Sequence, residues 1–379
     1  MHILFLHSSS DLYGASKILL AVTKLCKDKN HRITVVLSEK GELSDKLIEL
    51  GCEVLIIDLS ILRRQYFNFN GIVNRAWGLL KAYNKLKHIC QLEKVELIYS
   101  NTTGVIAGVL VASKLKIPHI WHIHEIIEKP TLLFRLLSAL LNKKINRCLV
   151  VSEAVKNHWA KYVKKSKMTV LYNGVDYWLF EDKKTTFRVE QNISDEAIVI
   201  GMMGRVHYWK GQDYFLRIAG QLNQQFSKLV FVLVGDAFPG YEYLYDNLDK
   251  IILEEKLEGV VRQVNYRSDI QNIYNALNIF ILPSQLPDPA PAVVTEAMAA
   301  GLPVIVTNQG GAIEMIEEGV SGIIIPLNDA ATAANKIAYL IQHEQIRIKM
   351  GAAAKTRIKQ YFSRENFNVQ IINFIEQKQ

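Results

Sequence analysis

Short runs of β-branched and aliphatic residues recur along the chain, and each run ends in a polar or glycine-containing turn that precedes a helical stretch. Several runs are almost continuously apolar, which is typical of parallel strands buried on both faces of a sheet. Strands that alternate with helices in this way predict βαβ units and a doubly wound α/β sheet. The predicted strands are residues 3–7, 33–38, 53–58, 97–101, 119–124, 148–152 and 168–173 in the first half, and 198–204, 229–235, 261–266, 279–284, 303–307 and 322–326 in the second.

The strand pattern starts again at about residue 197, after a polar segment with weak periodicity. We therefore predict an α/β protein with two Rossmann-like, doubly wound parallel-sheet domains and a cleft between them. Ligands of such sheets bind beyond the carboxyl ends of the strands, so motifs at strand ends matter most. The predicted parts are a first domain at 1–175, a linker at 176–196, a second domain at 197–360, and a final helix at 361–379 that packs back on the first domain.

The composition fits this organisation, because 379 residues are too many for one compact core and suit two domains. The four cysteines show neither CxxC nor metal-site spacing, so we expect reduced thiols in a cytosolic protein. The opening MHILFLHSSS lacks the basic leader of a signal peptide, and no run approaches the ~18 apolar residues of a membrane span. We expect a protein that is soluble or bound at a surface.

Charge is spread unevenly over a net charge of +8. Residues 1–175 hold 26 Lys and Arg against 13 Asp and Glu, whereas residues 176–379 hold 19 against 24. This asymmetry predicts an anionic partner for the first half, either nucleic acid or a membrane, although a solvated surface without a partner gives the same pattern. The basic half contains no recognition helix, zinc spacing or aromatic-basic RNA motif, so we expect no nucleic-acid partner.

Two carboxylates flank a predicted helix start in DPAPAVVTEAMAAGLPVIV, residues 288–306. Asp288 follows a strand, and Glu296 lies about one turn into a helix that starts near Ala292. A helix start offers free N–H groups and a partial positive charge, so it binds anions such as a diphosphate. Carboxylates accept hydrogen bonds from sugar hydroxyls, so the pattern suits a diphosphate with a sugar on each side. The alternative is a surface Asp and a dipole-favoured Glu without a ligand.

Basic residues leave another strand end in GRVHYWKG, which begins at Gly204. Arg205 and Lys210 can both reach phosphate oxygens from there. The glycines do not make a GxGxxG fingerprint, so a nicotinamide cofactor is not indicated.

The first strand ends in HSSSDLYGASKILL, where the small residues Gly14 and Ala15 precede a helix. Their backbone can approach a ligand closely, although a tight βα turn needs the same residues. In HIWHIHE, His122 and His124 share one face of a strand. A zinc site lacks a third ligand at matching spacing, and a histidine at a strand end can donate to a substrate hydroxyl.

Together these motifs resemble glycosyltransferase family 4, the retaining, nucleotide-sugar-dependent transferases of GT-B fold. The resemblance covers nearly the whole chain. It runs in order through YGASKILL, WHIHEI, VVSEAVKNHW, VLYNGVD, MGRVHYWKGQDYFLRIA, LVGDAFPG, YRSDIQNIYNALNIFILPS and the block that begins DPAPAVVTEAMAAGLPVI and ends at GIIIP. The last block is the most specific, because its acid, seven residues, Glu and later Gly-Gly look like the family's donor-binding signature.

The resemblance implies a role for each motif residue of the second domain. Glu296 would bind the donor's ribose, and Asp288 would bind the hydroxyls of the transferred sugar. Arg205 and Lys210 would stabilise the diphosphate and the negative charge that grows as the glycosidic bond breaks. Further donor contacts would come from Gly204, the N–H groups of Ala292 and Val293, and Tyr266 near the base.

In the first domain, the resemblance implies that Gly14 and Ala15 approach the diphosphate and that His124 contacts the transferred sugar, with His122 as the second choice. The family mechanism needs no metal or other cofactor, and neither half of the chain contains a DxD motif. Two positions depart from the family pattern. The first signature acid is usually Glu and is Asp288 here, and the first loop reads GAS where Gly-Gly and an acid are common.

The resemblance implies a metal-independent hexosyltransferase that moves a sugar from a UDP- or GDP-sugar to a glycan or lipid-linked acceptor, in capsule, exopolysaccharide or lipopolysaccharide synthesis. The first domain would hold the acceptor. The stretches TLLFRLLSALLNKKINR and VNRAWGLLKAYNKLKH are Leu-rich and basic, so we expect peripheral association with the inner face of the cytoplasmic membrane, or else two solvated core helices. The remaining alternatives are a nucleotide-sugar epimerase and a non-enzymatic nucleotide-sugar-binding protein.

Overall fold

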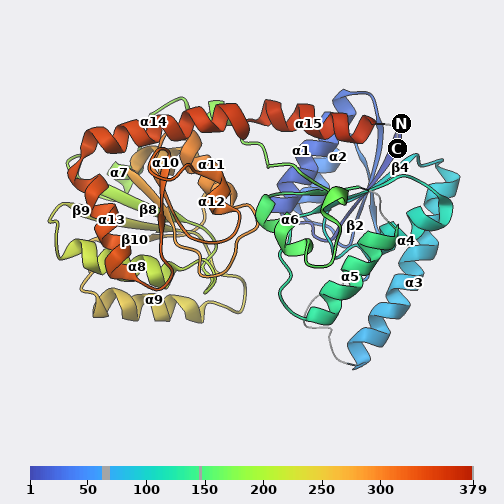
Figure 1. Cartoon of the computed structure of the whole chain (residues 1–379), viewed down its shortest axis with the longest axis horizontal. Helices are drawn as coiled ribbons and strands as arrows, with labels where there is room; N and C mark the ends of the chain where they lie inside the picture. Colours follow the sequence, from blue (N-terminus) through green and yellow to red (C-terminus); the bar gives the residue numbers. More distant parts are fainter. Residues whose placement is uncertain (62–68, 145–146, 378–379) are drawn as a thin grey trace. The chain divides into compact units, whose positions relative to one another are not determined.

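A computed structural model of the chain describes residues 1–61, 69–144 and 147–377. The chain divides into two compact units, which we describe separately (Figure 1). The first unit comprises Met1–Asn173 and Phe367–Gln379, and the second comprises Gly174–Asn366. Both are α/β units with one parallel sheet, and together they make the doubly wound, two-domain GT-B architecture that the sequence predicts.

The first unit contains a seven-stranded sheet with the strand order β3-β2-β1-β4-β5-β6-β7. All its strand pairs are parallel. Its elements are β1 (His2–His7), α1 (Gly14–Asp28), β2 (Arg32–Leu37), α2 (Glu42–Glu49), β3 (Glu53–Ile56), α3 (Phe69–Leu92), β4 (Leu97–Ser100), α4 (Ile106–Leu115), β5 (His119–Ile123), α5 (Thr131–Lys144), β6 (Cys148–Val150), α6 (Glu153–Trp159), the 3-10 helix η2 (Lys165–Lys167) and β7 (Met168–Val170).

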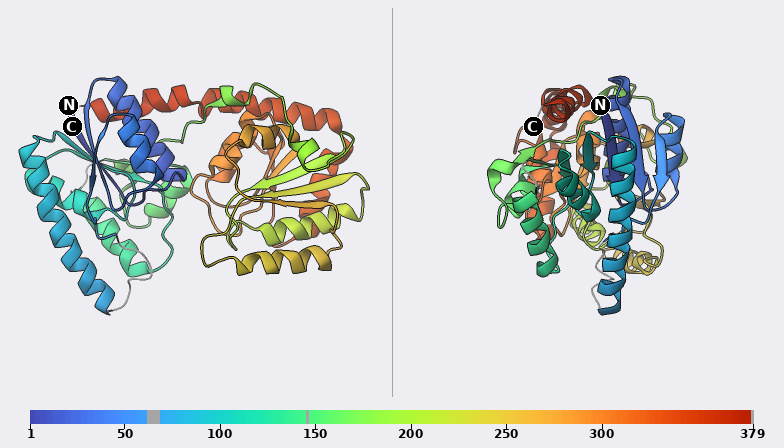
Figure 2. Two further views of the ribbon diagram at one scale, coloured as in Figure 1. Left: turned by 180° about the vertical axis from the view of Figure 1, so that it is seen from behind. Right: turned by 90° about the vertical axis from the view of Figure 1, so that its right-hand side faces the viewer.

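Alternate residues of β1 serve two cores, one on each face of this sheet. Ile3 and Phe5 pack with residues of α1 and α2, whereas Leu4 and Leu6 pack with residues of α3 and α4. A strand buried on both faces needs this continuous apolar sequence, which is why the pattern is readable. The last helix, α15 (Arg364–Glu376), adds apolar side chains to the core that contains Phe5. Figure 2 shows α15 ending close to the N-terminal end of the chain, where Glu376 contacts His31 at 3.1 Å.

The second unit contains a six-stranded parallel sheet with the order β10-β9-β8-β11-β12-β13. Figure 1 shows helices on both faces of it, with α8 and α9 on one face and α10 and α11 on the other. Its elements are η3 (Tyr177–Phe180), α7 (Phe187–Glu190), β8 (Ile198–Met203), α8 (Gln212–Asn223), β9 (Leu229–Val234), α9 (Tyr243–Glu254), β10 (Val261–Val264), α10 (Ile270–Ala276), β11 (Ile279–Leu282), α11 (Ala292–Ala299), β12 (Val304–Thr307), α12 (Ala312–Met315), β13 (Gly322–Ile325), α13 (Ala330–Gln342) and α14 (Glu344–Tyr361).

The strand order reverses at one point in each sheet, between β1 and β4 in the first unit and between β8 and β11 in the second, so successive strands are added outward on either side of that point. The loops that leave two such neighbouring strands diverge and open a crevice at the carboxyl edge of the sheet. The predicted donor-binding loops follow β8 and β11, so the fold places them at the reversal point of the second unit.

Residues 176–196, which we predicted as a linker, are part of the second unit and carry η3 and α7. Asn272 of α10 holds this segment, because its side-chain oxygen accepts from the N–H groups of Thr186 and Phe187 at 2.8 and 3.2 Å. Arg188 extends the attachment with a 3.0 Å hydrogen bond to the Ala276 carbonyl. In these contacts, polar side chains form hydrogen bonds with the backbone. Such contacts need no hydrophobic periodicity, which is why the sequence of this segment reads as a linker.

The part of the chain that the structure describes contains no helix long and apolar enough to cross a membrane. The predicted final helix at 361–379 includes residues 378–379, and the basic stretch TLLFRLLSALLNKKINR, which forms α5, includes residues 145–146; these four residues lie outside the described residues.

Candidate functional site

The loops after β8 and β11 bring Lys210 and Asp288 into contact at the carboxyl edge of the second sheet. The Lys210 ammonium forms an ion pair with the Asp288 carboxylate, and both side chains are mostly buried, with 20% and 15% of their area exposed. The sequence separates these residues by 78 positions, and only the pairing of β8 with β11 brings their loops together.

Gly211 allows the loop after β8 to approach the loop after β11, and Gly310 allows the loop after β12 to approach Asp288. Gly211 has a positive φ of +82°, and a Cβ atom there would lie 2.1 Å from the Pro283 carbonyl oxygen. Gly310 has a φ of +66°, and its Cβ would lie 2.6 Å from backbone atoms of Asp288. The next residue, Gly311, donates its N–H to the Asp288 carbonyl at 2.7 Å. The Gly-Gly of the predicted signature therefore fixes the loop that carries Asp288.

Two contacts hold Arg205, one to its side chain and one to its backbone carbonyl. Its guanidinium carbon lies 3.5 Å from the ring centroid of Phe238, a cation–π contact that fixes the orientation of the side chain. Gln212 donates from Nε2 to the Arg205 carbonyl at 2.9 Å. Burial lowers the pKa of the neighbouring His207, and the positive charges of Arg205 and Lys210 lower it further. His207 is therefore neutral at pH 7 and adds no third positive charge to those of Arg205 and Lys210.

Glu296 lies on α11, the helix that begins at Ala292 after Pro291. The Tyr274 hydroxyl donates to Glu296 Oε2 at 2.9 Å and lies 3.2 Å from the Val293 carbonyl. Burial raises the pKa of Tyr274 well above its usual range, so the phenol stays protonated and remains a donor. The first N–H groups of α11, those of Ala292 and Val293, have no partner within the helix and give this end a partial positive charge.

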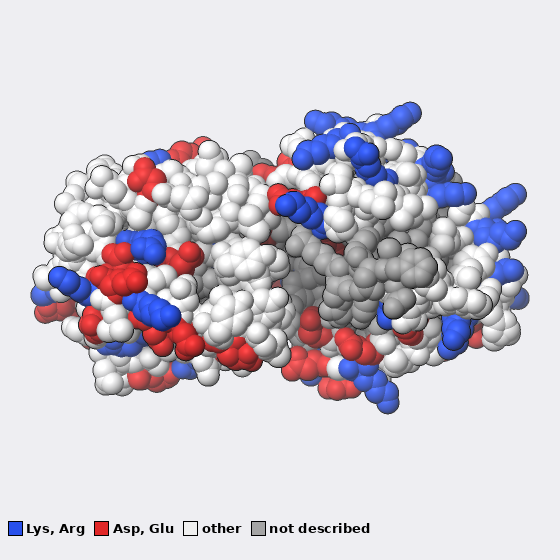
Figure 3. Space-filling model, turned by 90° about the horizontal axis from the view of Figure 1, so that it is seen from below, with Lys and Arg blue, Asp and Glu red and all other residues white. Residues whose placement is uncertain are grey.

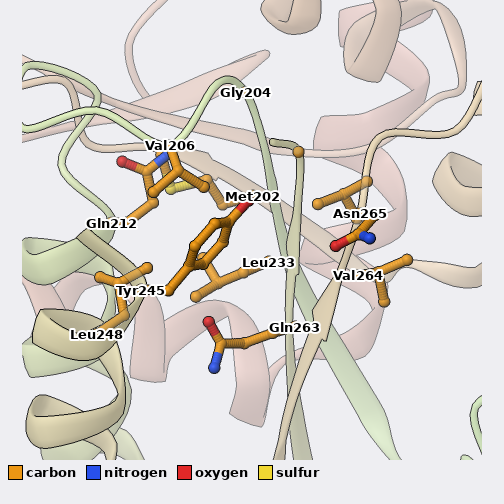
Figure 4. Close-up of a pocket in the computed structure, with 12 residues that line it drawn as sticks. Met202, Gly204, Val206, Gln212, Leu233, Tyr245, Leu248, Gln263, Val264 and Asn265 are labelled. Atoms are coloured by element: carbon orange, nitrogen blue, oxygen red, sulfur yellow. The ribbon is translucent and has the colours of Figure 1, made fainter. Parts of the chain in front are cut away.

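Tyr266 lies beyond β10, half exposed, and its N–H donates to Asp236 Oδ1 at 3.1 Å. A cavity between these loops and the sheet is lined by the side chains drawn in Figure 4, among them Gln212, Tyr245 and Gln263. Its volume is about 20 Å³, which is room for about one water molecule and far too little for a nucleotide. This cavity, which Gly204 also lines, is therefore not the site of the predicted donor contacts.

The first unit brings Gly14, Ala15 and His124 together through one side chain, that of Asn101. Asn101 Nδ2 donates to the Ala15 carbonyl at 2.9 Å, and its Oδ1 lies 3.0 Å from His124 Nε2. Gly14 begins α1, and a Cβ atom added there would meet nothing within 4 Å. The space beside Gly14 is therefore open, as a ligand-facing helix start requires.

The two candidate histidines have different surroundings. His122 is completely buried, and its Nδ1 lies 2.7 Å from the Tyr99 hydroxyl. His124 follows the end of β5 and is half-buried. Burial lowers the pKa of both rings, that of His122 to about 3, so both are neutral at pH 7. Of the two, only His124 is placed to meet a ligand.

Sequence reasoning missed three residues of these sites. Asn101 follows β4 directly and Tyr274 lies in α10, but neither stands in a motif that signals its contacts. Glu125 is adjacent to His124, and burial raises the pKa of its carboxyl to about 7. A polar residue that directly follows a buried strand was the available signal for Asn101 and Glu125. Among the described residues, no group of three His, Cys, Asp or Glu side chains could hold a metal ion.

Arg205 and Lys210 follow β8, and Asp288 and the start of α11 follow β11, so they lie at the carboxyl edge of one sheet, where a helix start and basic side chains suit an anion such as a diphosphate. The profile for glycosyl transferases group 1 matches residues 183–357, and the profile for glycosyltransferase family 4 matches residues 13–178. Between them they cover most of the chain, which therefore belongs to the glycosyltransferases that these profiles describe.

Individual relatives agree with this assignment. The chain is 26% identical over 353 residues to the UDP-Gal:α-D-GlcNAc-diphosphoundecaprenol α-1,3-galactosyltransferase of Escherichia coli, covering 89% of this chain and 87% of that enzyme. It is 28% identical over 259 residues to an uncharacterised glycosyltransferase of Methanocaldococcus jannaschii, covering 65% of this chain but only 60% of the relative. Among solved structures, HepE of Anabaena in complex with UDP superimposes with a TM-score of 0.88 at 24% identity, over 100% of both chains.

Proposed function

We propose that this glycosyltransferase moves a sugar, with retention of anomeric configuration, from a UDP-sugar to a lipid-linked saccharide. GDP-sugars remain the second donor class. The observation that carries the proposal is the meeting of Arg205, Lys210, Asp288 and the start of α11 at one sheet edge. Negative charge develops on a leaving diphosphate at such a site, and fixed donors lower the barrier most where charge develops.

Each residue then has a distinct task. Arg205 and Lys210 bind the diphosphate and stabilise it as the bond from the anomeric carbon to the phosphate oxygen breaks. Asp288 accepts from hydroxyls of the transferred sugar and keeps Lys210 in position until the donor binds. Glu296 accepts from the ribose hydroxyls. The two cations and the helix dipole supply the positive charge, so we propose that the reaction needs no metal ion.

The remaining contacts complete the donor site. Tyr266 lies toward the base, and the N–H groups of Ala292 and Val293 bind the diphosphate. From the first unit, the backbone at Gly14 and Ala15 approaches the diphosphate, and neutral His124 contacts the transferred sugar. We propose front-side attack, in which the leaving phosphate takes the acceptor's hydroxyl proton.

The E. coli relative supports the choice of substrates, because its name specifies a UDP-sugar donor and a saccharide on diphosphoundecaprenol as acceptor. An acceptor of this kind lies at a membrane, so we propose a role in cell-surface polysaccharide synthesis at the cytoplasmic membrane.

The surface of the first unit supports a membrane location. Helix α3 exposes Val73, Trp77 and Leu80 at helical spacing, with Trp77 64% exposed, and α5 exposes Leu132 and Leu136. Both helices pack against α4. Figure 3 shows Lys and Arg gathered along the edge of the first unit, at the right of the view. Exposed apolar residues beside basic ones suit an anionic bilayer, where each Lys or Arg contributes about 1 kcal/mol.

A thermal-shift titration with UDP, GDP, ADP, TDP and CMP tests the donor site. We expect UDP to stabilise the protein most, by about 2.7 kcal/mol at 100 times its dissociation constant. Glu296→Ala should weaken UDP binding about 5- to 150-fold, because a lost ribose contact costs about 1–3 kcal/mol. Glu254→Ala, on the exposed face of α9, is the matched control and should bind UDP normally.

The absence of a shift with every nucleotide, in a folded sample, would contradict the donor site. Product analysis then separates transfer from epimerisation, because a transferase releases nucleoside diphosphate only when the sugar moves to an acceptor or to water.

A further inference from the structure

The hydrogen bonds of Asn101 determine which ring nitrogen of His124 carries the proton. Asn101 directly follows β4 and has no exposed surface. Its side-chain Nδ2 donates to the Ala15 carbonyl at 2.9 Å. Because a carbonyl oxygen only accepts, the amide nitrogen has to face Ala15, and the amide oxygen Oδ1 is the atom that faces His124.

His124 therefore donates to Asn101 through Nε2. The Oδ1 atom of Asn101 lies 3.0 Å from this nitrogen, and an amide oxygen has no proton to give. With the proton on Nδ1 instead, two lone pairs would face each other across this distance, and both atoms would lose a hydrogen bond. Burial lowers the pKa of His124 well below its usual range, and His122 and His7 lower it further, so the ring carries only one proton. Nδ1 is then a hydrogen-bond acceptor.

Two further histidines keep this arrangement in place. Nδ1 of His7, the last residue of β1, donates to the backbone carbonyl of Asn101 at 2.8 Å. The ring of His122 packs against that of His124, with the two ring centroids 4.1 Å apart. Both His7 and His122 are buried. The ring of His124 is therefore oriented before any ligand arrives, which is the preorganisation that a binding contact needs.

The Nδ1 atom of His124 is left for a ligand. Among the residues that the structure describes, none forms a hydrogen bond with it. The residue is half-buried, in contrast to His119 and His122, each of which has a fully buried ring nitrogen without a partner. A neutral nitrogen with a lone pair takes a hydrogen bond from a hydroxyl and cannot give one.

We propose that Asn101 is a positioning residue, which holds His124 in the Nε2–H tautomer so that Nδ1 accepts a hydrogen bond from a hydroxyl of the transferred sugar. The inference rests on the proposed function, because it takes the ligand of His124 to be the sugar of the donor. It adds the direction of this hydrogen bond and, with it, a requirement on the donor. A sugar with hydrogen or fluorine in place of that hydroxyl leaves Nδ1 without its partner.

The position of the proton can be measured directly. Proton–nitrogen correlation NMR of protein labelled at the histidine ring nitrogens distinguishes the two neutral tautomers, and the signals missing from His124→Phe belong to His124. We expect only the Nε2–H tautomer in the wild-type protein. In Asn101→Leu, which keeps roughly the size of the side chain but removes the acceptor, we expect a mixture of both tautomers.

Asn142→Leu is the matched control for the spectra. Asn142 lies on α5 of the same unit and also donates from its side chain to a backbone carbonyl, that of Tyr162. This substitution removes a comparable hydrogen bond away from His124, so the signals of His124 should not change. A change of tautomer in Asn101→Leu alone is a result that a general loss of stability does not produce.

Binding of donor analogues tests what the lone pair does. The probes are UDP-glucose, UDP-galactose and their N-acetylamino counterparts, and titration calorimetry identifies the one that binds most tightly. Its monodeoxy and monofluoro analogues follow, one sugar hydroxyl at a time. We expect one position at which both analogues bind at least about tenfold more weakly than the parent, because neither can donate to Nδ1. If His124 donated instead, fluorine would still accept weakly, and only the deoxy analogue would lose affinity.

Variants connect this loss of affinity to the two residues. In His124→Phe the parent and the two analogues should bind equally, and in Asn101→Leu the difference between them should shrink, as expected of groups that act together. Asn142→Leu should keep the full tenfold difference.

Failure of this inference and failure of the donor site look different. The inference is overturned if wild-type His124 carries its proton on Nδ1, or if the fluoro analogues bind as well as the parent at every position. The wild-type spectrum needs no variant, so the first of these outcomes is decided even if Asn101→Leu does not fold. If neither UDP nor any UDP-sugar binds to the folded protein, the proposed donor site itself is wrong.

Discussion

At the scale of single residues, the ion pair between Lys210 and Asp288 holds two residues of the proposed donor site in place. Each side chain gives the other a charged partner at a mostly buried position. Neither side chain must therefore reorganise against water when a donor enters. A diphosphate can replace the carboxylate as the partner of Lys210, which frees Asp288 to accept from the transferred sugar.

Replacing Lys210 should affect turnover more than binding. In Lys210→Ala we expect kcat to fall about 100- to 1,000-fold, because the ammonium stabilises charge that appears only as the leaving group departs. The KM for the donor should change much less. Initial rates over a range of donor concentrations give both constants.

Lys228→Ala is the matched control for this experiment. Lys228 pairs with Glu196 in the same unit, and both side chains are largely exposed. The Lys228→Ala substitution should leave kcat unchanged, because an exposed ion pair contributes little to stability and Lys228 takes no part in the proposed donor site. A large rise in KM with normal kcat in Lys210→Ala would contradict the role that we assign to this lysine.

At the scale of elements, the strand ends of the first unit gather four histidines whose rings are neutral in the folded state. His7 ends β1, His119 begins β5, His122 lies within β5 and His124 directly follows it. Burial lowers the pKa of His7 to about 4 and that of His119 to about 3, and it also lowers the pKa values of His122 and His124. Unfolding restores an ordinary pKa near 6.5, so the unfolded chain binds more protons below that pH.

The first unit should therefore lose stability in mild acid. The contribution of each histidine is present above pH 6.5 and is lost as the pH falls, by about 2 kcal/mol at pH 5. Glu125 acts in the opposite direction, because its raised pKa favours the folded state below about pH 4.5 and this contribution is lost as the pH rises through 7. Four histidines outweigh one carboxyl, so we expect a net loss of stability from pH 7 to pH 5.

Urea unfolding at the two pH values measures this, with fluorescence of the buried Trp121 and Trp159 as the signal. In Glu125→Gln the opposing contribution is gone, so the loss on acidification should be larger by about 2 kcal/mol. Equal stability of the wild-type protein at pH 7 and pH 5 would contradict the assignment of neutral histidines.

The sequence predicted the strands and helices better than it predicted the contacts between side chains. The thirteen strands that the described residues form were predictable because parallel strands buried on both faces need uninterrupted apolar runs. The sequence also predicted that Arg205, Lys210 and Asp288 follow strand ends and that Glu296 lies in a helix, and the structure places them there. The partners of these residues were not predicted, since Phe238 and Tyr274 contact Arg205 and Glu296 from other loops and helices. The contacts of Glu125 were not predicted for the same reason, because the residues that line the pocket beside it come from four separate segments of the chain.

At the scale of the whole molecule, the unequal charge of the two halves and the exposed residues of α3 and α5 predict binding to membranes. We expect the protein to bind vesicles that contain anionic lipid, and to release as salt rises from about 0.05 to about 0.5 M. Trp77→Ser combined with Leu132→Ser should weaken binding about tenfold or more, because two exposed apolar side chains no longer enter the bilayer.

Leu253→Ser is the control for the vesicle experiment, because Leu253 is similarly exposed but lies on α9 of the second unit. Vesicle flotation gives the bound fraction for each variant. If the double variant still binds vesicles, or if binding does not change with salt concentration, the exposed residues of α3 and α5 are not the membrane contact.

The position of α15 has a consequence for synthesis on the ribosome. Phe367, Ile371 and Phe374 belong to the same core as Phe5 and Leu19, so the first unit is completed only by residues that follow the whole second unit in the sequence. The second unit, by contrast, is continuous in the chain and has all its strands by Ile325. One face of the N-terminal sheet therefore stays partly uncovered while the whole second unit is translated, and the nascent chain must be protected from aggregation for that interval.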